Sequence, residues 1–436
     1  MTNTLKYLFV AVISFPLLFC SKTDTIPPPP PSPPDNHTPS ISSVHPVTGG
    51  YMTQIVISGK NFSTDSLKDI VKVNGVNAVI VNARVDTIVA MVPLGAGTGP
   101  VTVTINGATT AGNVFTYSSA LVVSTFAGNG INDFNHGASS ISTINNPYAI
   151  AVDEQGNVYV SEFDRIKKIK PDGEISVLAG NGIMGYKDTI GREAEFAYPQ
   201  GLAVDKQGNV FVADNSVIRK ITPDGVVTTF AGSLPNGFAD GQGAAAKFFG
   251  PTGLAIDADG NLYVSDYGNK RIRKITPDAT VTTLAGNGVS DYRDGPGDQA
   301  EFFDIQTLAV DHQGNVYVCE TWNGRVRKIT PDGTVSVFIG STTSLVGSDS
   351  APLGIAIDAA DNIYVGDHGV VVKISSSGEH TIYAGSVYVG DGILGYKDGP
   401  ALTAQFYGPN GLAVDKQGNV YVSDQPNFRI RKISFQ

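Results

Sequence analysis

A phrase of sixteen residues that returns along the chain constrains the fold more than any other feature. Residues 199–214 read PQGLAVDKQGNVFVAD, and residues 251–266 and 409–424 repeat the phrase almost intact. Looser copies start at Pro147, Ile305 and Pro352. An aspartate follows the first apolar run of each copy, and these aspartates lie roughly fifty residues apart: Asp153, Asp205, Asp257, Asp311, Asp358 and Asp415. Six copies at this period predict six similar blades of a propeller.

Each copy reads as four short strands. Leu-Ala-Val is the first strand, and Val-Tyr-Val the second. Between them Asp-x-x-Gly-Asn predicts a tight turn, because Asp can bond its own backbone and Gly supplies a positive φ. Asp361 replaces the turn glycine in the fifth copy. Arg-Ile-Arg-Lys-Ile is the third strand, and Thr-Pro-Asp-Gly then turns into the fourth, Val-x-Thr-Leu-Ala-Gly.

The sixth copy ends at Gln436 without a fourth strand. Residues 121–128, LVVSTFAG, match a fourth strand but follow no first three. We therefore expect residues 121–128 to complete the last blade and close the ring, which removes exposed sheet edges.

The repeated phrases resemble NHL repeats over residues 121–436. Those phrases are Ala-Val-Asp-x-x-Gly-Asn-Val-Tyr-Val-Ser-Asp and Asn-x-Arg-Ile-Arg-Lys-Ile. The resemblance implies a six-bladed NHL β-propeller. It implies little about activity, because such propellers include receptors, scaffolds, lyases and lactonase-like hydrolases.

Residues 38–118 read as a separate all-β unit of alternating apolar runs separated by Gly and Asn turns. The pattern Pro39-x-Ile41, Val56-x-x-Gly59-x-Asn61-Phe62, Val92-Pro93 and Phe115-x-Tyr117 resembles an IPT/TIG domain. This resemblance implies a small immunoglobulin-like sandwich that acts as a spacer or an adhesion module. The predicted fold class is therefore all-β, with an IPT/TIG sandwich followed by a propeller over residues 119–436.

Residues 1–19 read as a signal peptide, with Lys6 before an apolar run too short to span a membrane. Leu17-Leu18-Phe19-Cys20 resembles a bacterial lipobox, although Phe19 replaces the usual small residue. We expect a lipid on Cys20; secretion with cleavage nearby is the alternative. Residues 20–37 then form a proline-rich spacer. The expected location is the outer membrane of a Gram-negative cell envelope, with the folded part at the surface.

The charge and the cysteines exclude some functions. A net charge of −10 argues against nucleic acid, because phosphate binding needs a basic surface. The Arg-Lys pairs recur once per repeat, so we expect solvated strand positions. Cys319 lies in an apolar strand and is expected to be a small buried hydrophobe.

Antiparallel strands place alternate connections on opposite faces of a blade. The two short turns share one face, and the second-to-third and the long fourth-to-first connections share the other, here called the long-loop face. Variable loops commonly carry binding sites, so we place any site there. Tyr186, Phe238, Tyr292 and Tyr396 each stand two residues before an aspartate in equivalent loops. Their recurrence favours loop packing and capping over calcium binding.

Residues unique to one blade are freer to be functional. The second-to-third connections of blades three, four and six are longer, and they hold Tyr267 and Trp322, the only tryptophan. An exposed aromatic side chain can stack on a sugar or anchor a protein, although Trp322 could instead cover a blade edge. The variable position after each repeat proline, or its equivalent, should approach the axis: Tyr148, Gln200, Thr252, Gln306, Leu353 and Asn410.

This axial ring offers no histidine or carboxylate for zinc or calcium. No zincin, phosphate-loop or nucleophile-elbow motif appears either. We therefore expect a non-catalytic envelope lipoprotein without cofactor or metal, whose propeller binds a glycan or an envelope protein. Candidate ligand-binding residues are Trp322, Tyr267, Tyr148, Gln200, Gln306 and Asn410. A scaffold within an envelope complex and a lactonase- or lyase-like enzyme are the alternatives.

Overall fold

The computed structural model describes residues 38–51, 53–64, 69–93, 96–131, 143–340, 345, 350–376, 378–386 and 395–436. The signal peptide, Cys20 and the proline-rich spacer lie outside these residues. Among the described residues, no helix combines the length and apolar character that crossing a bilayer requires. Strands dominate, and the helical elements are single 3-10 turns.

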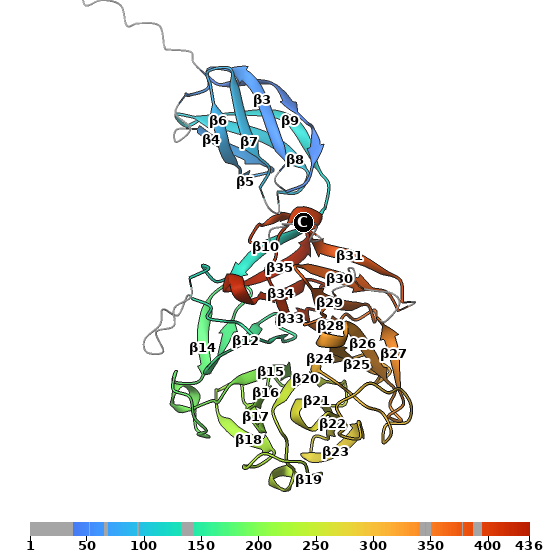
Figure 1. Cartoon of the computed structure of the whole chain (residues 1–436). Coiled ribbons are helices and arrows are strands. Elements are labelled where there is room, and N and C mark those ends of the chain that lie inside the picture. Colours follow the sequence, from blue (N-terminus) through green and yellow to red (C-terminus); the bar gives the residue numbers. More distant parts are fainter. Residues whose placement is uncertain are drawn as a thin grey trace, which may run out of the picture.

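The N-terminal unit is a sandwich of two sheets (Figure 1). The first sheet has the order β1 (Ser40–His45), β3 (Gln54–Lys60), β7 (Thr87–Met91) and β6 (Val79–Ala83). The second has the order β2 (Thr48–Gly49), β9 (Ala108–Tyr117), β8 (Gly99–Ile105), β4 (Asp69–Val73) and β5 (Val76–Asn77). Alternate residues such as Ile55, Ile57, Val101 and Val103 point inward and are buried in one core. The predicted sandwich is confirmed.

Six blades of four main strands follow around a central axis, and two of them carry a short fifth strand (Figure 1). Blade one contains β11 (Ile150–Val152), β12 (Val158–Glu162), β13 (Arg165–Ile169) and β14 (Ile175–Ala179). Blade two contains β15 (Pro199–Val204), β16 (Val210–Asp214), β17 (Val217–Ile221) and β18 (Val227–Ala231). Blade three contains β20 (Pro251–Ile256), β21 (Leu262–Asp266), β22 (Arg271–Ile275) and β23 (Thr280–Ala285), with β19 (Gly241–Gln242) beside β23.

The remaining blades repeat this order. Blade four contains β24 (Ile305–Val310), β25 (Val316–Glu320), β26 (Arg325–Ile329) and β27 (Val335–Ile339). Blade five contains β28 (Ile355–Ile357), β29 (Ile363–Asp367), β30 (Val370–Ile374) and β31 (His380–Gly385). Blade six contains β33 (Pro409–Val414), β34 (Val420–Asp424) and β35 (Arg429–Phe435), joined by β10 (Leu121–Ala127) and β32 (Gly399–Pro400).

The ring closes as the sequence predicts. Strand β10 pairs antiparallel with β35, from Leu121 opposite Phe435 to Ala127 opposite Ile430. The first strand of the propeller part in the sequence is thus the outer strand of the last blade. The sandwich lies beside this blade (Figure 1).

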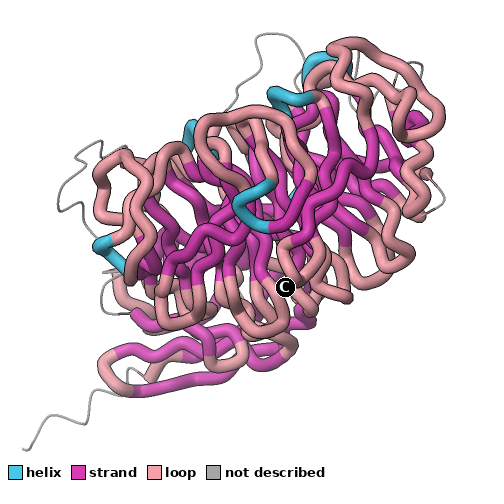
Figure 2. Tube along the Cα trace, turned by 90° about the horizontal axis from the view of Figure 1, so that it is seen from below, coloured by secondary structure: helices cyan, strands magenta, loops and turns pink. Residues whose placement is uncertain are grey.

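The predicted Asp-x-x-Gly-Asn turns are present on the short-turn face. In blade one, the Asp153 carboxylate accepts hydrogen bonds from the backbone N–H groups of Gln155 (3.0 Å) and Asn157 (2.8 Å) and from the Tyr159 hydroxyl (3.0 Å). Asp361, which stands where the other copies have glycine, adopts the expected positive φ of 59°. Seen from the side, the strands form a middle layer with loops on both faces (Figure 2).

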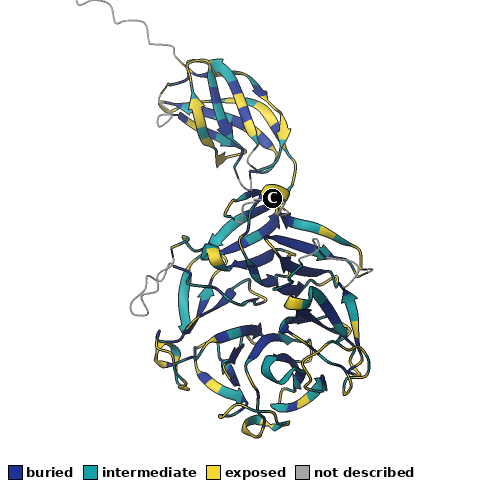
Figure 3. Cartoon of the chain, in the orientation of Figure 1, coloured by how far each residue is buried: buried dark blue, intermediate teal, exposed yellow. Residues whose placement is uncertain are grey.

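The core lies between adjacent blades, where apolar faces of neighbouring sheets pack together (Figure 3). One expectation is wrong here. Each Arg-Lys pair was expected to be solvated, yet Arg219, Arg273, Arg327 and Arg431 are fully buried. The lysine that follows each arginine is partly exposed, so the expectation fails for the arginines alone.

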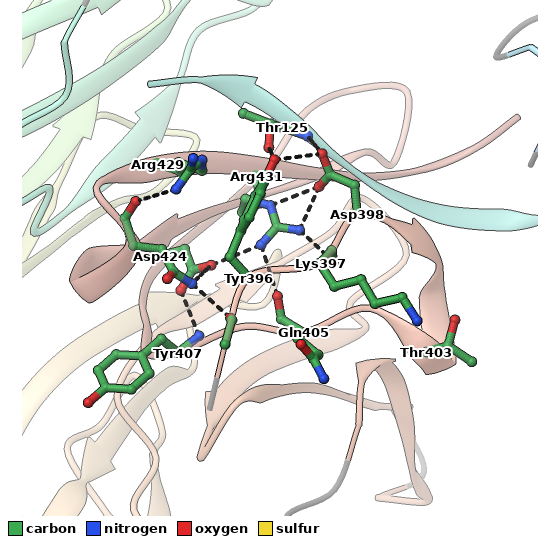
Figure 4. Close-up of polar contacts among 12 residues, drawn as sticks. Thr125, Tyr396, Lys397, Asp398, Thr403, Gln405, Tyr407, Asp424, Arg429 and Arg431 are labelled. Carbon is green, nitrogen blue, oxygen red and sulfur yellow. Dashed lines mark hydrogen bonds and ion pairs between the residues drawn. The ribbon is translucent and has the colours of Figure 1, made fainter. Parts of the chain in front are cut away.

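These four buried arginines make the same contacts. In blade six, the Arg431 guanidinium donates to Asp424 at 2.9 Å and to Asp398 at 2.6 Å, and lies 4.8 Å from the Tyr396 ring centroid (Figure 4). The acidic residues at the equivalent positions pair in the same way with Arg219, Arg273 and Arg327. The recurring aromatic and aspartate side chains of the long loops therefore hold buried arginines, which agrees with the packing and capping interpretation.

Candidate ligand-binding face

The long-loop face differs among the blades, as the sequence indicates. Three second-to-third connections form 3-10 turns: η3 (Tyr267–Asn269) in blade three, η4 (Thr321–Asn323) in blade four and η6 (Gln425–Asn427) in blade six. A left-handed residue ends each turn: Lys270, Gly324 and Phe428 respectively. Blades one, two and five have tight two-residue turns there. The three longer turns project additional side chains onto this face.

Trp322 projects into solvent from η4. Trp322 is 79% exposed, so its side chain does not cover a blade edge. An exposed indole of this size presents a flat apolar surface that can stack on another ring.

Four other aromatic residues stand near the start of the first strands on this face. Phe249, Phe303 and Tyr407 occupy one repeat position, and Tyr198 follows that position by one residue. All four are between 44% and 49% exposed. We call these four residues and Trp322 the aromatic rim. Sequence reasoning missed the four because recurrence was taken as a sign of a structural role.

The backbone beneath the aromatic rim is fixed by the acidic residue that ends each second strand. The N–H of Phe249 donates to Asp266 at 2.9 Å, and the N–H of Tyr407 donates to Asp424 at 2.9 Å. Since these carboxylates also pair with the buried arginines, the repeat holds the rim residues at equivalent places in successive blades.

The structure brings four of the six predicted axial-ring residues together. Tyr148, Thr252, Gln306 and Asn410 line a cavity of about 50 Å³ at the axis, whereas Gln200 and Leu353 are not among its lining residues. Ligand pockets commonly measure about 300–1,000 Å³, so this cavity accommodates water rather than a sugar ring. A ligand as large as a sugar would contact the long-loop face and would not enter this cavity.

A carboxylate that sequence reasoning overlooked lies beside this ring. Asp304 is only 2% exposed, and its carboxylate accepts hydrogen bonds from Gln306 Nε2 (3.0 Å) and from the backbone N–H of Trp322 (3.4 Å). The Tyr267 phenol lies close to the same carboxylate. Burial, followed by the negative charge of Asp304, raises the pKa of Tyr148 and that of Tyr267.

A second polar cluster joins blade six to blade one. The Asn410 side chain donates to Gln425, and Gln425 Nε2 donates to Asn146 Oδ1 at 2.9 Å. These neutral amides offer both donor and acceptor groups. The candidate residues thus form two groups on the face: Tyr267, Gln306 and Trp322 around Asp304, and Asn410 with Gln425 and Asn146.

Wider hollows lie on the short-turn face. They measure about 330 Å³ and about 470 Å³ and are lined by turn aspartates such as Asp257. The Asp257 oxygens accept bonds from their own turn, including Asn261 Nδ2 at 2.8 Å, so they shape the turn. Within the described ranges, no three His, Cys, Asp or Glu side chains come together in a group that could hold a metal ion.

Comparison with known families identifies the two parts. The IPT/TIG domain family matches residues 39–117, and the NHL repeat family matches residues 248–275 and 406–433. The chain carries an IPT/TIG domain and an NHL-repeat propeller. The Teneurin NHL domain family also matches residues 181–238, in the second blade and the loop before it.

Curated relatives are much longer than this chain. Teneurin-1 of Mus musculus is 26% identical over 265 residues, which cover 56% of this chain and 8% of the teneurin. Teneurin-4 of Mus musculus is 26% identical over 342 residues, which cover 69% of this chain and 11% of the relative. The chain therefore spans about a tenth of the length of these teneurins.

Solved structures share the arrangement over most of the chain. An auxiliary nutrient binding protein from Bacteroides thetaiotaomicron has a TM-score of 0.59 and 18% identity, with 92% of this chain and 98% of that chain covered. An auxiliary nutrient binding protein from Bacteroides ovatus has a TM-score of 0.58 and 18% identity, with 91% and 97% covered. At this identity the likeness shows the fold alone.

Proposed function

We propose that this chain is a non-catalytic binding protein whose NHL propeller takes a glycan on its long-loop face. The observation that carries the proposal is the aromatic rim, with Trp322 as its most exposed member. Aromatic rings stack on the apolar faces of sugar rings, and exposed aromatic anchors dominate many binding surfaces. The fold likeness to two auxiliary nutrient binding proteins is consistent with a binding role.

The polar groups beside the rim suit a neutral hydroxylated ligand. Gln306, Asn410 and Gln425 are amides, which both donate and accept hydrogen bonds without the desolvation cost of a net charge. The phenols of Tyr148 and Tyr267 add hydroxyl groups, which can donate and accept hydrogen bonds. Stacking on the rim together with amide contacts would give a glycan both affinity and orientation.

A glycan array tests the proposal directly. The wild-type chain is expected to bind at least one glycan, and Trp322→Ala is expected to weaken that binding about fivefold to two-hundredfold, as loss of a stacking anchor does. Phe435→Ala is the matched control. Phe435 is a 69% exposed aromatic residue at the end of β35 in blade six and does not belong to the aromatic rim. A chain that binds no glycan, or a Trp322→Ala variant that binds like the wild type, would contradict the proposal. Capture of an envelope protein instead would favour the scaffold alternative.

We further propose that the protein is exported and anchored in the outer membrane through a lipid on Cys20. The apolar run that ends at this cysteine supports the proposal. Cys20→Ala should move the protein from the membrane fraction to the soluble fraction. Unchanged fractionation of Cys20→Ala would contradict lipid anchoring.

A further inference from the structure

One buried carboxylate gathers three groups of the long-loop face. Asp304 precedes β24 in blade four and accepts from Gln306 of the same blade and from the backbone of Trp322 in η4. The phenol of Tyr267, which begins η3 in blade three, lies close to the same carboxylate. Asp304 thus connects the turns of two adjacent blades at the point where the most exposed aromatic side chain projects.

Each longer turn contacts the next blade through its first residue. Gln425 of η6 donates to Asn146 at 2.9 Å, and the Thr321 hydroxyl of η4 donates to the Pro352 carbonyl at 2.8 Å. Both of these hydrogen bonds join neutral groups. At η3, among the described turns, the group of the next blade that lies close to the first residue is instead a carboxylate, that of Asp304.

The charge at this position is not a requirement of the repeat. The six equivalent residues are Asn146, Tyr198, Gly250, Asp304, Ala351 and Gly408. A carboxylate that is 2% exposed loses most of its hydration, which is costly unless several donors replace the water. Blades with Gly or Ala here close without such a group, so the carboxylate of Asp304 serves something other than blade closure.

We propose that Asp304 is the positioning residue of the binding face, where its carboxylate holds Trp322, Tyr267 and Gln306 in a preformed platform for the ligand. This inference rests on the proposed function. A surface that is already ordered loses less conformational entropy when a ligand binds, so positioning improves affinity without a contact to the ligand. Lys270 reinforces the arrangement, because its ammonium lies 4.0 Å from the centroid of the Tyr267 ring.

Trp322 is the chain's only tryptophan, so its signals report on this platform without any ligand. Fluorescence anisotropy follows the mobility of its indole, and 5-fluorotryptophan gives a single ¹⁹F resonance. Asp304→Ala is expected to lower the anisotropy and change the ¹⁹F line, because the backbone N–H of Trp322 and the side-chain amide of Gln306 lose their acceptor. Asp304→Asn keeps one acceptor oxygen and should lie between Asp304→Ala and the wild type.

Asp188→Ala is the matched control. This variant removes a carboxylate that pairs with the buried Arg219 in blade two and leaves the groups around Asp304 unchanged. An effect of general destabilisation on Trp322 would therefore appear in this variant too, whereas local loosening around Asp304 would not. Its Trp322 anisotropy should equal that of the wild type. If Asp304→Ala does not fold, Asp304→Asn decides the question: a lowered anisotropy supports the proposal, and a wild-type value overturns it.

A folded Asp304→Ala variant with wild-type anisotropy and ¹⁹F line would overturn the positioning role. Binding to the glycan array gives the second measurement, in which Asp304→Ala should lose affinity about as much as Trp322→Ala does. If the wild type binds no glycan, the proposed function fails, whereas the anisotropy still shows whether Asp304 positions Trp322. The two failures are therefore distinguishable.

Discussion

The backbone N–H of Thr125 donates a hydrogen bond of 3.0 Å to the carboxylate of Asp398, a residue 273 positions further along the chain. Asp398 also accepts from Arg431 at 2.6 Å (Figure 4). In blade two, Asp188 makes the same contacts with Thr229 and Arg219, but Thr229 follows Arg219 closely in the sequence. At the ring closure the contact instead joins the start of the propeller to its end.

Asp398→Ala should therefore weaken the closure selectively. Loss of the carboxylate leaves the Thr125 N–H and a fully buried arginine each short of a partner, at a cost of about 1–3 kcal/mol. Hydrogen exchange of the β10 amides should accelerate. Asp188→Ala, with the same chemistry in a continuous blade, should lower the free energy of unfolding similarly but leave β10 protected. Equal exchange of β10 in both variants would contradict a special role at the closure.

The buried pair of Asp424 and Arg431 should be easier to replace than to break. Both side chains are fully buried, and their charged atoms lie 2.9 Å apart. Asp424→Ala should lower the free energy of unfolding by about 3–5 kcal/mol, because the arginine loses its buried counterion. The double variant Asp424→Leu with Arg431→Met should recover much of this loss in chemical denaturation. Blade five is a precedent for the arginine position alone: Val372 stands there, while Asp367 keeps the acidic position and accepts from other groups such as the N–H of Ala351.

Two aromatic residues of blade four should differ in their effect on stability. Trp322→Ala should change the free energy of unfolding by no more than about 0.5 kcal/mol, because the residue is 79% exposed. Phe302→Ala should cost about 3–5 kcal/mol, because Phe302 is fully buried and a cavity would remain. Thermal denaturation of both variants checks the contrast. Strong destabilisation by Trp322→Ala would show that the indole packs against the fold.

Cys319 should be unreactive in the folded protein. Burial raises the pKa of its thiol to about 12, so the nucleophilic thiolate is scarce at pH 8. Mass spectrometry after iodoacetamide treatment should show Cys319 unmodified in the native protein and modified after unfolding in denaturant. Rapid native modification at pH 8 would contradict the buried environment.

The repeat allowed the blade number, the strand order and the closure by residues 121–128 to be predicted from sequence. This succeeded because strand alternation and turn chemistry are local: Asp153 and Asn157 specify their turn within five positions. The IPT/TIG sandwich was predicted for the same reason. The buried arginines were not, because their partners come from distant loops, as with Asp398 and Arg431.

The sequence by itself determined the architecture and which face carries the variable loops. It also singled out Tyr267 and Trp322, because they stand in the longer second-to-third loops, and Gln306, because its repeat position approaches the axis. Only the tertiary structure decided that these three groups meet at Asp304, and that recurring residues such as Phe303 stay partly exposed. The physical reason is that a propeller assembles its face from different blades. The neighbours of a side chain there are fixed when the ring closes, and the local pattern around each residue does not encode them.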